Sequence, residues 1–366
     1  MNIGILTFHN AFNYGAVLQA FSLQLFLESI GHKVEIINYH NTKVDKAYAL
    51  FRIRGVLRKN PIKSVKYLTI SLFRWRKFPV FKNNVYKILN ISHRVFSLND
   101  LNIIKKDIII IGSDQLWNNK ITGGYDPFYW ADFVRNGKVR AITYAVCMNT
   151  DKLKPDDILI IKKKLTNFTS ISVRETDLAK ILRPLTAKQI YISLDPTFLI
   201  DKYTWHDLLK GEKPPIDKPY VLVFAILNRD HVVKTAQLFA ASKNMPLVVM
   251  DPIAEIRPFT NHFQPMSPFG FISAIAHADY IITSSFHGLA FSIIFNREVY
   301  VFGDTGRNER MKSLLNVIGI NERFIDGSEI PNFSEIDYDV VESKLEVLRN
   351  NSQNYLNKSI YNIFYQ

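Results

Sequence analysis

Residues 278–295 of the chain read ADYIITSSFHGLAFSIIF, and their pattern is the clearest indication of the fold class. Its residues 280–282 are a short apolar run typical of a buried strand, and an apolar segment with helical spacing follows Thr283, Ser284 and Ser285. A strand that turns directly into a helix leaves the first N–H groups of that helix without partners. These groups and the helix dipole favour an anion. The stretch therefore predicts an α/β unit with an anion-binding turn.

The same turn contains two further candidate functional residues. Gly288 allows a ligand to approach the backbone closely, and His287 is the one group in the turn that exchanges a proton near neutral pH. The alternative is an ordinary strand–helix turn, in which the hydroxyls cap the helix and the histidine belongs to the core. The functional interpretation makes Ser284, Ser285 and Gly288 ligand contacts and His287 a catalytic residue.

The length and composition of the chain are those of a folded protein with room for two domains. It has 366 residues, of which 47% are hydrophobic and 13% aromatic. Cys147 is the only cysteine, so the chain by itself forms neither a disulfide framework nor a zinc cluster, which suits a reducing cytosol. Residues 1–8 enter a strand-like run without a basic leader, and no apolar run is long enough to span a bilayer. We expect a cytoplasmic protein.

The formal charge of +13 is concentrated in one part of the sequence. Residues 46–99 contain thirteen Lys and Arg and no Asp or Glu, so the rest of the chain is about neutral. The interval also contains large apolar side chains. One interpretation is an amphipathic surface, peripheral at the inner face of a membrane, that contacts anionic lipid head groups or a lipid-linked diphosphate. The other is a solvated helical hairpin whose apolar stripe packs on the core. No nucleic-acid-binding module is recognisable, so we expect no nucleic acid partner.

The N-terminal part of the chain predicts a parallel sheet. Residues 3–8 are strand-like, residues 17–27 have a helical pattern, and residues 34–38 form a second strand-like run, which together make a βαβ unit. The loop after the first strand contains Asn13 and Tyr14, at the sheet edge where ligands of open α/β sheets bind. It lacks the G-x-G-x-x-G pattern of dinucleotide-binding proteins.

Polar residues also follow two later strands of this region. Asp114 and Gln115 come after residues 107–111 and are suited to hydrogen-bond sugar hydroxyls, with Trp117 as an apolar face for a sugar ring. The alternative is an ordinary turn in which Asp114 caps a helix. Arg174 follows residues 170–173 and is a candidate anion ligand. An ion pair with Glu175 or Asp177 at a helix start is the alternative.

A polar segment, residues 201–218, separates this pattern from a second one and predicts an interdomain linker. Strand-like runs then alternate with helical patterns up to a charged loop at residues 303–310, and a long polar helix ends the chain. This organisation predicts two Rossmann-like domains that face each other across a cleft, with the C-terminal helix packing back on the first domain. The expected parts are residues 1–205 with the basic insertion 46–99, residues 206–335, and residues 336–366.

Taken together, these motifs resemble the polysaccharide pyruvyl transferase family over nearly the whole chain. The resemblance rests on residues 4–7, 13–16, 112–117, 172–175, 195–197 and 283–288, in this order and spacing. It implies a GT-B-like arrangement and an enzyme that moves the enolpyruvyl unit of phosphoenolpyruvate onto a sugar of a cell-surface polysaccharide or its lipid-linked precursor. The implied product is a cyclic ketal that bridges two hydroxyls, with phosphate released. The implied scheme needs no metal and no cofactor beside the donor.

The resemblance also implies roles for particular residues. The arginine of an S-V-R pattern and an S-R-x-H-G segment correspond to Arg174 and His287 as donor-binding and catalytic residues. Ser285 stands where many members have arginine, so Arg310 or Arg307 in the nearby loop would replace that donor contact. Asn13, Tyr14, Asp114, Gln115 and Trp117 would then serve the acceptor.

The proposed chemistry fits these residues. Phosphoenolpyruvate carries a phosphate and a carboxylate, and the helix start at residues 284–288 and the Arg174 guanidinium would bind two anions. His287 would deliver a proton to the methylene carbon or remove one from the attacking hydroxyl. Two alternatives remain open at this point: a GT-B glycosyltransferase that uses a nucleotide sugar, and a non-catalytic carbohydrate-binding subunit of an envelope polysaccharide complex.

Overall fold

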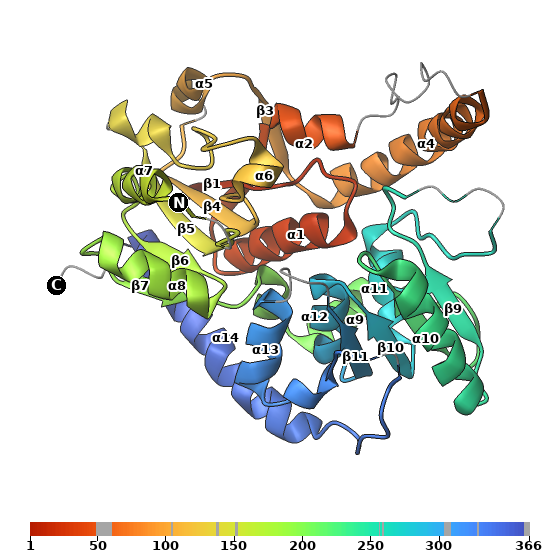
Figure 1. Cartoon of the computed structure of the whole chain (residues 1–366). Coiled ribbons are helices and arrows are strands. Elements are labelled where there is room, and N and C mark those ends of the chain that lie inside the picture. Colours follow the sequence, from red (N-terminus) through yellow and green to blue (C-terminus); the bar gives the residue numbers. More distant parts are fainter. Residues whose placement is uncertain are drawn as a thin grey trace.

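The computed structural model describes every residue except 49–60, 104, 137–138, 151–152, 256, 258–259, 304–308, 328 and 362–366. The chain folds into two β-sheets that lie side by side and are flanked by helices (Figure 1). All pairings between named strands are parallel. This confirms the predicted α/β class with two Rossmann-like sheets.

The first sheet has seven strands, and its order reverses between β1 and β4. α1 connects β1 to β2, so the predicted βαβ unit is present. Ligands of open α/β sheets bind in the crevice at such a reversal. In spatial order the strands are β3 (Ile91–Val95), β2 (Lys33–Tyr39), β1 (Asn2–Leu6), β4 (Ile108–Asp114), β5 (Arg140–Val146), β6 (Ile171–Val173) and β7 (Ile190–Ile192).

The second sheet has five strands, and its order reverses between β10 and β8. The predicted strand and helix of residues 278–295 are both present, as β10 and α12, and the turn between them lies at this reversal. In spatial order the strands are β12 (Phe324–Ile325), β11 (Glu298–Phe302), β10 (Tyr280–Thr283), β8 (Val221–Phe224) and β9 (Leu247–Met250).

Helices cover both sheets, and capping residues set the start of several of them. Asn13 caps α1 and Ser285 caps α12. The α-helices before the second sheet are α1 (Tyr14–Ser29), α2 (Thr42–Ala47), α4 (Pro61–Ile88), α5 (Leu98–Ile103), α6 (Asn119–Thr122), α7 (Pro155–Leu165), α8 (Thr176–Leu182) and α9 (Lys202–Leu208). The others are α10 (Arg229–Ser242), α11 (Pro268–Ala276), α12 (Phe286–Ile294), α13 (Glu309–Ile318) and α14 (Tyr338–Tyr361). Short 3-10 helices lie at Asp132–Asn136, Arg183–Leu185, Pro196–Leu199 and Asn321–Arg323.

The two sheets share one hydrophobic core. Tyr14 of α1 stacks on Phe271 of α11 with ring centroids 4.8 Å apart, and its hydroxyl donates to Pro265 O at 2.7 Å. The polar segment 201–218 does connect the two sheets, but it includes α9, whose Trp205 is fully buried against Phe291. The expected linker is thus anchored in the shared core.

Helix α14 crosses from the second sheet to the first (Figure 1). Near its start the Tyr338 hydroxyl donates to Arg297 O, and near its end the Tyr355 hydroxyl donates to Thr143 O at 2.7 Å. Ser359 Oγ also donates to Ser170 Oγ at 2.9 Å. These contacts confirm that the C-terminal helix packs back on the N-terminal sheet.

Most of the basic interval that the structure describes is a single long helix, α4, rather than a helical hairpin. One face of α4 is buried: Phe78 stacks on Phe12 with ring centroids 3.7 Å apart, and Phe81 packs against Tyr14. Residues 49–60 of the interval lie outside the described residues. Within the described part of the chain, α4 and every other helix are too short or too polar to cross a bilayer.

Candidate active site

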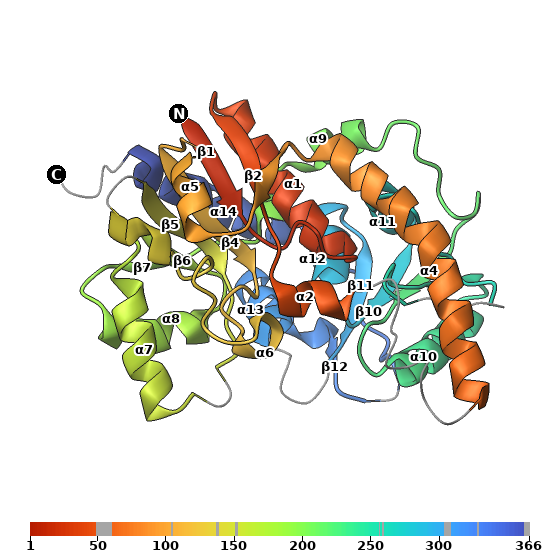
Figure 2. The ribbon, with the colours of Figure 1, turned by 90° about the horizontal axis from the view of Figure 1, so that it is seen from above.

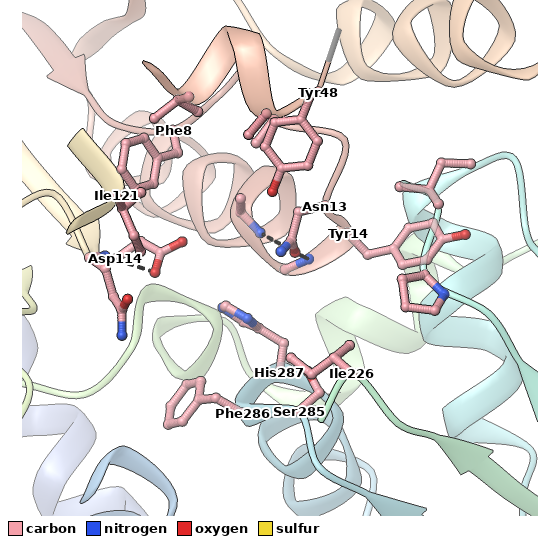
Figure 3. A pocket seen from close by; sticks show the side chains of 18 of the residues that line it. Phe8, Asn13, Tyr14, Tyr48, Asp114, Ile121, Ile226, Ser285, Phe286 and His287 are labelled. Atoms are coloured by element: carbon pink, nitrogen blue, oxygen red, sulfur yellow. Dashed lines mark hydrogen bonds between the residues drawn. The ribbon is translucent and has the colours of Figure 1, made fainter. Parts of the chain in front are cut away.

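A cavity of about 450 Å³ lies between the sheets, where the reversal points of both meet (Figure 3). Its walls come from the loop after β1, the start of α1, helix α2, the turn after β4, and the start of α12. It is lined by Phe8, Ala11, Asn13, Tyr14, Gly15, Ala16, Lys43, Val44, Ala47, Tyr48, Asp114, Gln115, Lys120, Ile121, Phe224, Ile226, Pro252, Ile253, Phe271, Ser285, Phe286, His287 and Arg310.

His287 lies in the first turn of α12 and points toward the space between Asp114 and Asn13 (Figure 3). Its ring packs directly on the backbone of Gly15 at the start of α1. A Cβ added at Gly15 would lie 2.0 Å from His287 Nδ1, so only glycine fits at position 15 with the ring in this place. The contact joins the two halves of the site, since α1 follows the first sheet's β1 and α12 follows the second sheet's β10.

The Asp195 carboxylate lies near the other ring nitrogen of His287. His287 Nε2 lies 3.6 Å from Asp195 Oδ2, and both atoms are buried. Burial by itself would raise the pKa of Asp195, but the Arg174 guanidinium and the contact with His287 lower it more, so the pKa lies well below its usual range. Asp195 is therefore an anion that lies 3.6 Å from Nε2, beyond hydrogen-bond distance but close enough to stabilise a positive charge on the ring, while Nδ1 lies on the side of Gly15.

Arg174, predicted as a donor ligand, does not line this cavity but a second hollow of about 50 Å³ that shares Phe286 with it. Its Nη2 lies 2.5 Å from Asp195 Oδ2 and donates to Ser113 Oγ, and its Cζ lies 4.7 Å from the Phe286 ring centroid. The Phe286 side chain thus separates Arg174 from the cavity. The ion pair is with Asp195, and neither Glu175 nor Asp177 is the partner. Arg174 keeps Asp195 charged.

Arg310 is the arginine that faces the cavity. It lies in the first turn of α13, with Nη1 3.7 Å from Asp114 Oδ1 and Cζ 5.7 Å from the Phe286 ring centroid. The Phe286 ring therefore contacts two guanidinium groups: that of Arg310, which lines the cavity, and that of Arg174, which does not. The alternative candidate, Arg307, lies outside the described residues.

The hydroxyls of the turn at residues 283–285 bond to the protein's own backbone, whereas the sequence predicted ligand contacts for Ser284 and Ser285. Ser284 Oγ accepts from the N–H groups of Ile226 and Leu227 at 3.0 and 2.9 Å, so it anchors the loop after β8 and does not line the cavity. Ser285 lines the cavity and accepts from Gly288 N at 3.4 Å as the helix cap. At Gly288 an added Cβ would lie 2.4 Å from Thr283 Oγ1, so packing inside the turn, rather than a ligand, requires glycine.

Two helix N-termini and three cations make the cavity favourable for anions. Asn13 Oδ1 caps α1 by accepting from Gly15 N at 2.9 Å, and Ser285 caps α12 across the cavity. Each helix start carries N–H groups that lack intrahelical partners and the positive end of a dipole. Among the residues that the structure describes, the lining includes Lys43, Lys120 and Arg310 and one carboxylate, Asp114. The positive charge exceeds the negative charge, as a doubly anionic ligand requires.

The wall formed by α2 is fixed by a buried asparagine. Asn41 Oδ1 accepts from the N–H groups of Lys43 and Val44, both at 3.0 Å. Its Nδ2 donates to Asp126 Oδ2 at 2.7 Å and to Thr122 O at 2.9 Å. Because these bonds tie α2 to α6, Lys43 and Lys120 are brought to the same cavity.

The acceptor residues predicted from the sequence divide into two groups. Asp114 and Gln115 line the cavity, and Gln115 N donates to Asp114 Oδ1 at 2.8 Å. Trp117 does not face the cavity: it is fully buried, it stacks on Trp130 at 4.2 Å, and its Nε1 donates to Tyr129 O. The idea of Trp117 as a platform for a sugar is wrong for this structure because the ring is part of the core.

Asn13 and Tyr14 line the cavity, but both side chains already have partners. The amide of Asn13 caps α1, and the Tyr14 hydroxyl donates to Pro265 O. In Figure 3 the Tyr14 ring points away from His287. Sequence reasoning missed the aromatic walls Phe8 and Tyr48, the lysines of α2 and α6, and Asp195 as the partner of His287. The signals for Asp195 were its place after a strand and its position in the motif at residues 195–197, but neither identifies a partner that is remote in sequence.

Comparison with known proteins identifies a family and a fold. A model of the polysaccharide pyruvyl transferase family matches residues 13–305. No curated protein matches the chain in sequence. A solved UDP-N-acetylglucosamine 2-epimerase is similar with a TM-score of 0.53 and 11% identity, covering 100% of this chain and 96% of that chain. This likeness shows the fold alone, and it agrees with the predicted GT-B-like arrangement.

Two further solved structures resemble the chain less closely. The UDP-GlcNAc 2-epimerase from Neisseria meningitidis, bound to UDP-GlcNAc, has a TM-score of 0.48 and 11% identity, with 99% of this chain and 98% of that chain covered. The glycosyltransferase SnogD from Streptomyces nogalater has a TM-score of 0.43 and 10% identity, with 99% and 98% covered.

Proposed function

The chain belongs to the polysaccharide pyruvyl transferase family, and we propose that it moves the enolpyruvyl unit of phosphoenolpyruvate onto a sugar of a cell-surface polysaccharide or its lipid-linked precursor. One observation carries the proposal. His287 lies at a net positive cavity between two helix N-termini, backed by the buried carboxylate of Asp195. Such a site combines anion binding with a proton-transfer group, which is what this reaction requires.

The reaction can be balanced with one proton-transfer group. Protonation of the methylene carbon C3 turns it into a methyl group and leaves C2 open to attack by a sugar hydroxyl. The second hydroxyl then attacks C2 as the C2–O bond to phosphate breaks. The two sugar hydroxyls release two protons in total. One of them replaces the proton that was added to C3, and the other leaves with phosphate. His287 Nδ1 would deliver the first proton and take one back, while Asp195 stabilises the charged ring.

The two anionic groups of the donor would occupy the positive part of the cavity. Arg310 offers a forked guanidinium to a phosphate or carboxylate, and the positive dipole ends at the starts of α1 and α12 add to the attraction. Arg310 would thus take the role of the family arginine that is replaced by Ser285. Asp114 and Gln115, which line the same cavity beside Arg310, would hydrogen-bond the acceptor hydroxyls.

The choice of donor is tested by binding and by turnover. Phosphoenolpyruvate should raise the midpoint of thermal unfolding, since a ligand at 100 times its Kd stabilises the folded state by about 2.7 kcal/mol. A panel of hexosides with two free neighbouring hydroxyl groups should then release phosphate and gain the mass of a pyruvate ketal. Stabilisation by nucleotide sugars alone, with release of nucleoside diphosphate, would instead favour a glycosyltransferase.

Arg310→Ala is expected to weaken donor use about tenfold to hundredfold, seen as a higher KM for phosphoenolpyruvate, because a charge-assisted contact is worth about 1.5–3 kcal/mol. Arg310→Lys should recover part of the loss. The matched control is Lys312→Ala, which removes the same charge from α13 without touching the cavity. Equal KM values for the Arg310→Ala variant and its control would exclude Arg310 as a donor ligand.

A further inference from the structure

Helix α4 carries an apolar stripe on the face that points away from the protein. Val65, Leu68, Leu72 and Trp75 are each between 58% and 64% exposed. Their spacing of three and four residues puts them on one side of the helix. Figure 2 shows α4 in the foreground, on the outside of the molecule. Large apolar side chains gathered in this way on a surface mark an interaction site.

The stripe is not a loosely packed remnant of the core, because the opposite face of α4 is firmly held. Lys77 Nζ donates to Gln264 Oε1 at 2.6 Å, Asn84 Nδ2 donates to Met266 O at 2.9 Å, and Arg74 donates to Ala254 O at 2.9 Å. Phe78 and Phe81 fill the core below. The helix therefore presents Val65, Leu68, Leu72 and Trp75 in a fixed orientation, and we call these four residues the outward stripe.

Charge decides what kind of partner fits the outward stripe. Arg76 and Lys87 are exposed on α4, and Lys82 lies near Tyr86 with Nζ 5.4 Å from the ring centroid. No Asp or Glu occurs anywhere in residues 46–99. Apolar side chains on a helix whose charged residues are all cations match an anionic lipid surface, where acyl chains take the apolar groups and phosphates take the charges. An exposed tryptophan among them is typical of the lipid–water interface.

We propose that the outward stripe of α4 docks on an anionic lipid bilayer, with Arg76, Lys82 and Lys87 on the head groups. The docking is peripheral, since α4 would lie in the interface plane and not cross it. The proposal does not depend on the reaction in the cavity, because no residue of the stripe lines that cavity. Loss of docking and loss of chemistry are therefore separable results.

Trp75 supplies a direct readout. Of the four tryptophans, Trp117, Trp130 and Trp205 are fully buried, so a change in emission on adding vesicles reports on Trp75. Vesicles of phosphatidylcholine with phosphatidylglycerol should shift the emission to the blue and sediment the protein. Vesicles of phosphatidylcholine alone should do neither. Raising the salt to 1 M should weaken binding, because the Debye length falls to about 3 Å.

Two variants separate the apolar and the charged contributions. The Leu68→Ser/Leu72→Ser double variant should bind phosphatidylglycerol vesicles at least about tenfold more weakly. The Arg76→Glu/Lys87→Glu variant should lose the preference for anionic lipid. The matched control is Leu159→Ser/Leu238→Ser, which removes two equally exposed leucines from α7 and α10 and should bind normally.

Three results would overturn the proposal. The first is equal binding to neutral and anionic vesicles, and the second is no binding to either. The third is a stripe variant that alters the sedimentation coefficient of the free protein, which would assign the outward stripe to a contact between two copies of this chain. Circular dichroism of each variant confirms that α4 remains folded, so failure to bind is not confused with unfolding.

Discussion

Replacing His287 with alanine is expected to lower turnover by about 10²–10⁴-fold, the contribution typical of one general acid–base group. The change removes the one histidine among the described residues that line the cavity. Donor binding should survive, because Arg310 and both helix N-termini are untouched. The measurement is the rate of phosphate release at saturating phosphoenolpyruvate, together with the rise in the unfolding midpoint that the donor produces.

His277→Ala is the matched control for this variant, since His277 is an exposed histidine at the end of α11 and lies outside the cavity. It should retain the turnover of the unaltered protein. Full activity in the His287→Ala variant would exclude the proposed proton transfer, and loss of donor binding together with turnover would assign His287 to binding instead.

Gly15→Ala is expected to have the second largest effect, about 10²-fold on turnover, although position 15 carries no chemistry of its own. The added Cβ would lie 2.0 Å from His287 Nδ1 and 2.3 Å from its Cγ, so the ring must leave its place beside Asp195. Turnover should therefore fall much more than the affinity for the donor. The measurement is kcat against KM, with the unfolding midpoint as a check on the fold.

A double-mutant cycle tests the cause of that loss. In the His287→Ala background the ring is absent, so adding Gly15→Ala should cost little further activity. Additive losses in the double variant would mean that Gly15→Ala acts on the start of α1 itself and not through the histidine ring.

The sequence predicted the fold well where the pattern is local. The apolar run and helical spacing of residues 278–295 appear as β10 and α12. His287, Arg310 and Asp114 do line one cavity. These positions follow from strand ends in parallel sheets, which lie at one edge whatever the side-chain packing.

Side-chain partners were predicted less well because they depend on contacts remote in sequence. Arg174 pairs with Asp195 behind Phe286, which no local spacing reveals. Ser284 anchors a loop 57 residues away in the sequence, at Leu227. Trp117 follows a strand as a surface residue would, yet Trp130 covers it. In each case burial by a distant segment overrides the local signal.

The path of α14 has a consequence for biosynthesis. This helix leaves the second sheet at Tyr338 and completes the first at Tyr355, yet it is translated after both sheets. Until then the flank of the first sheet around Tyr144 and Tyr191, which Tyr355 covers, faces solvent or a chaperone. The N-terminal half therefore emerges first from the ribosome, but its packing is complete only after α14 has been translated.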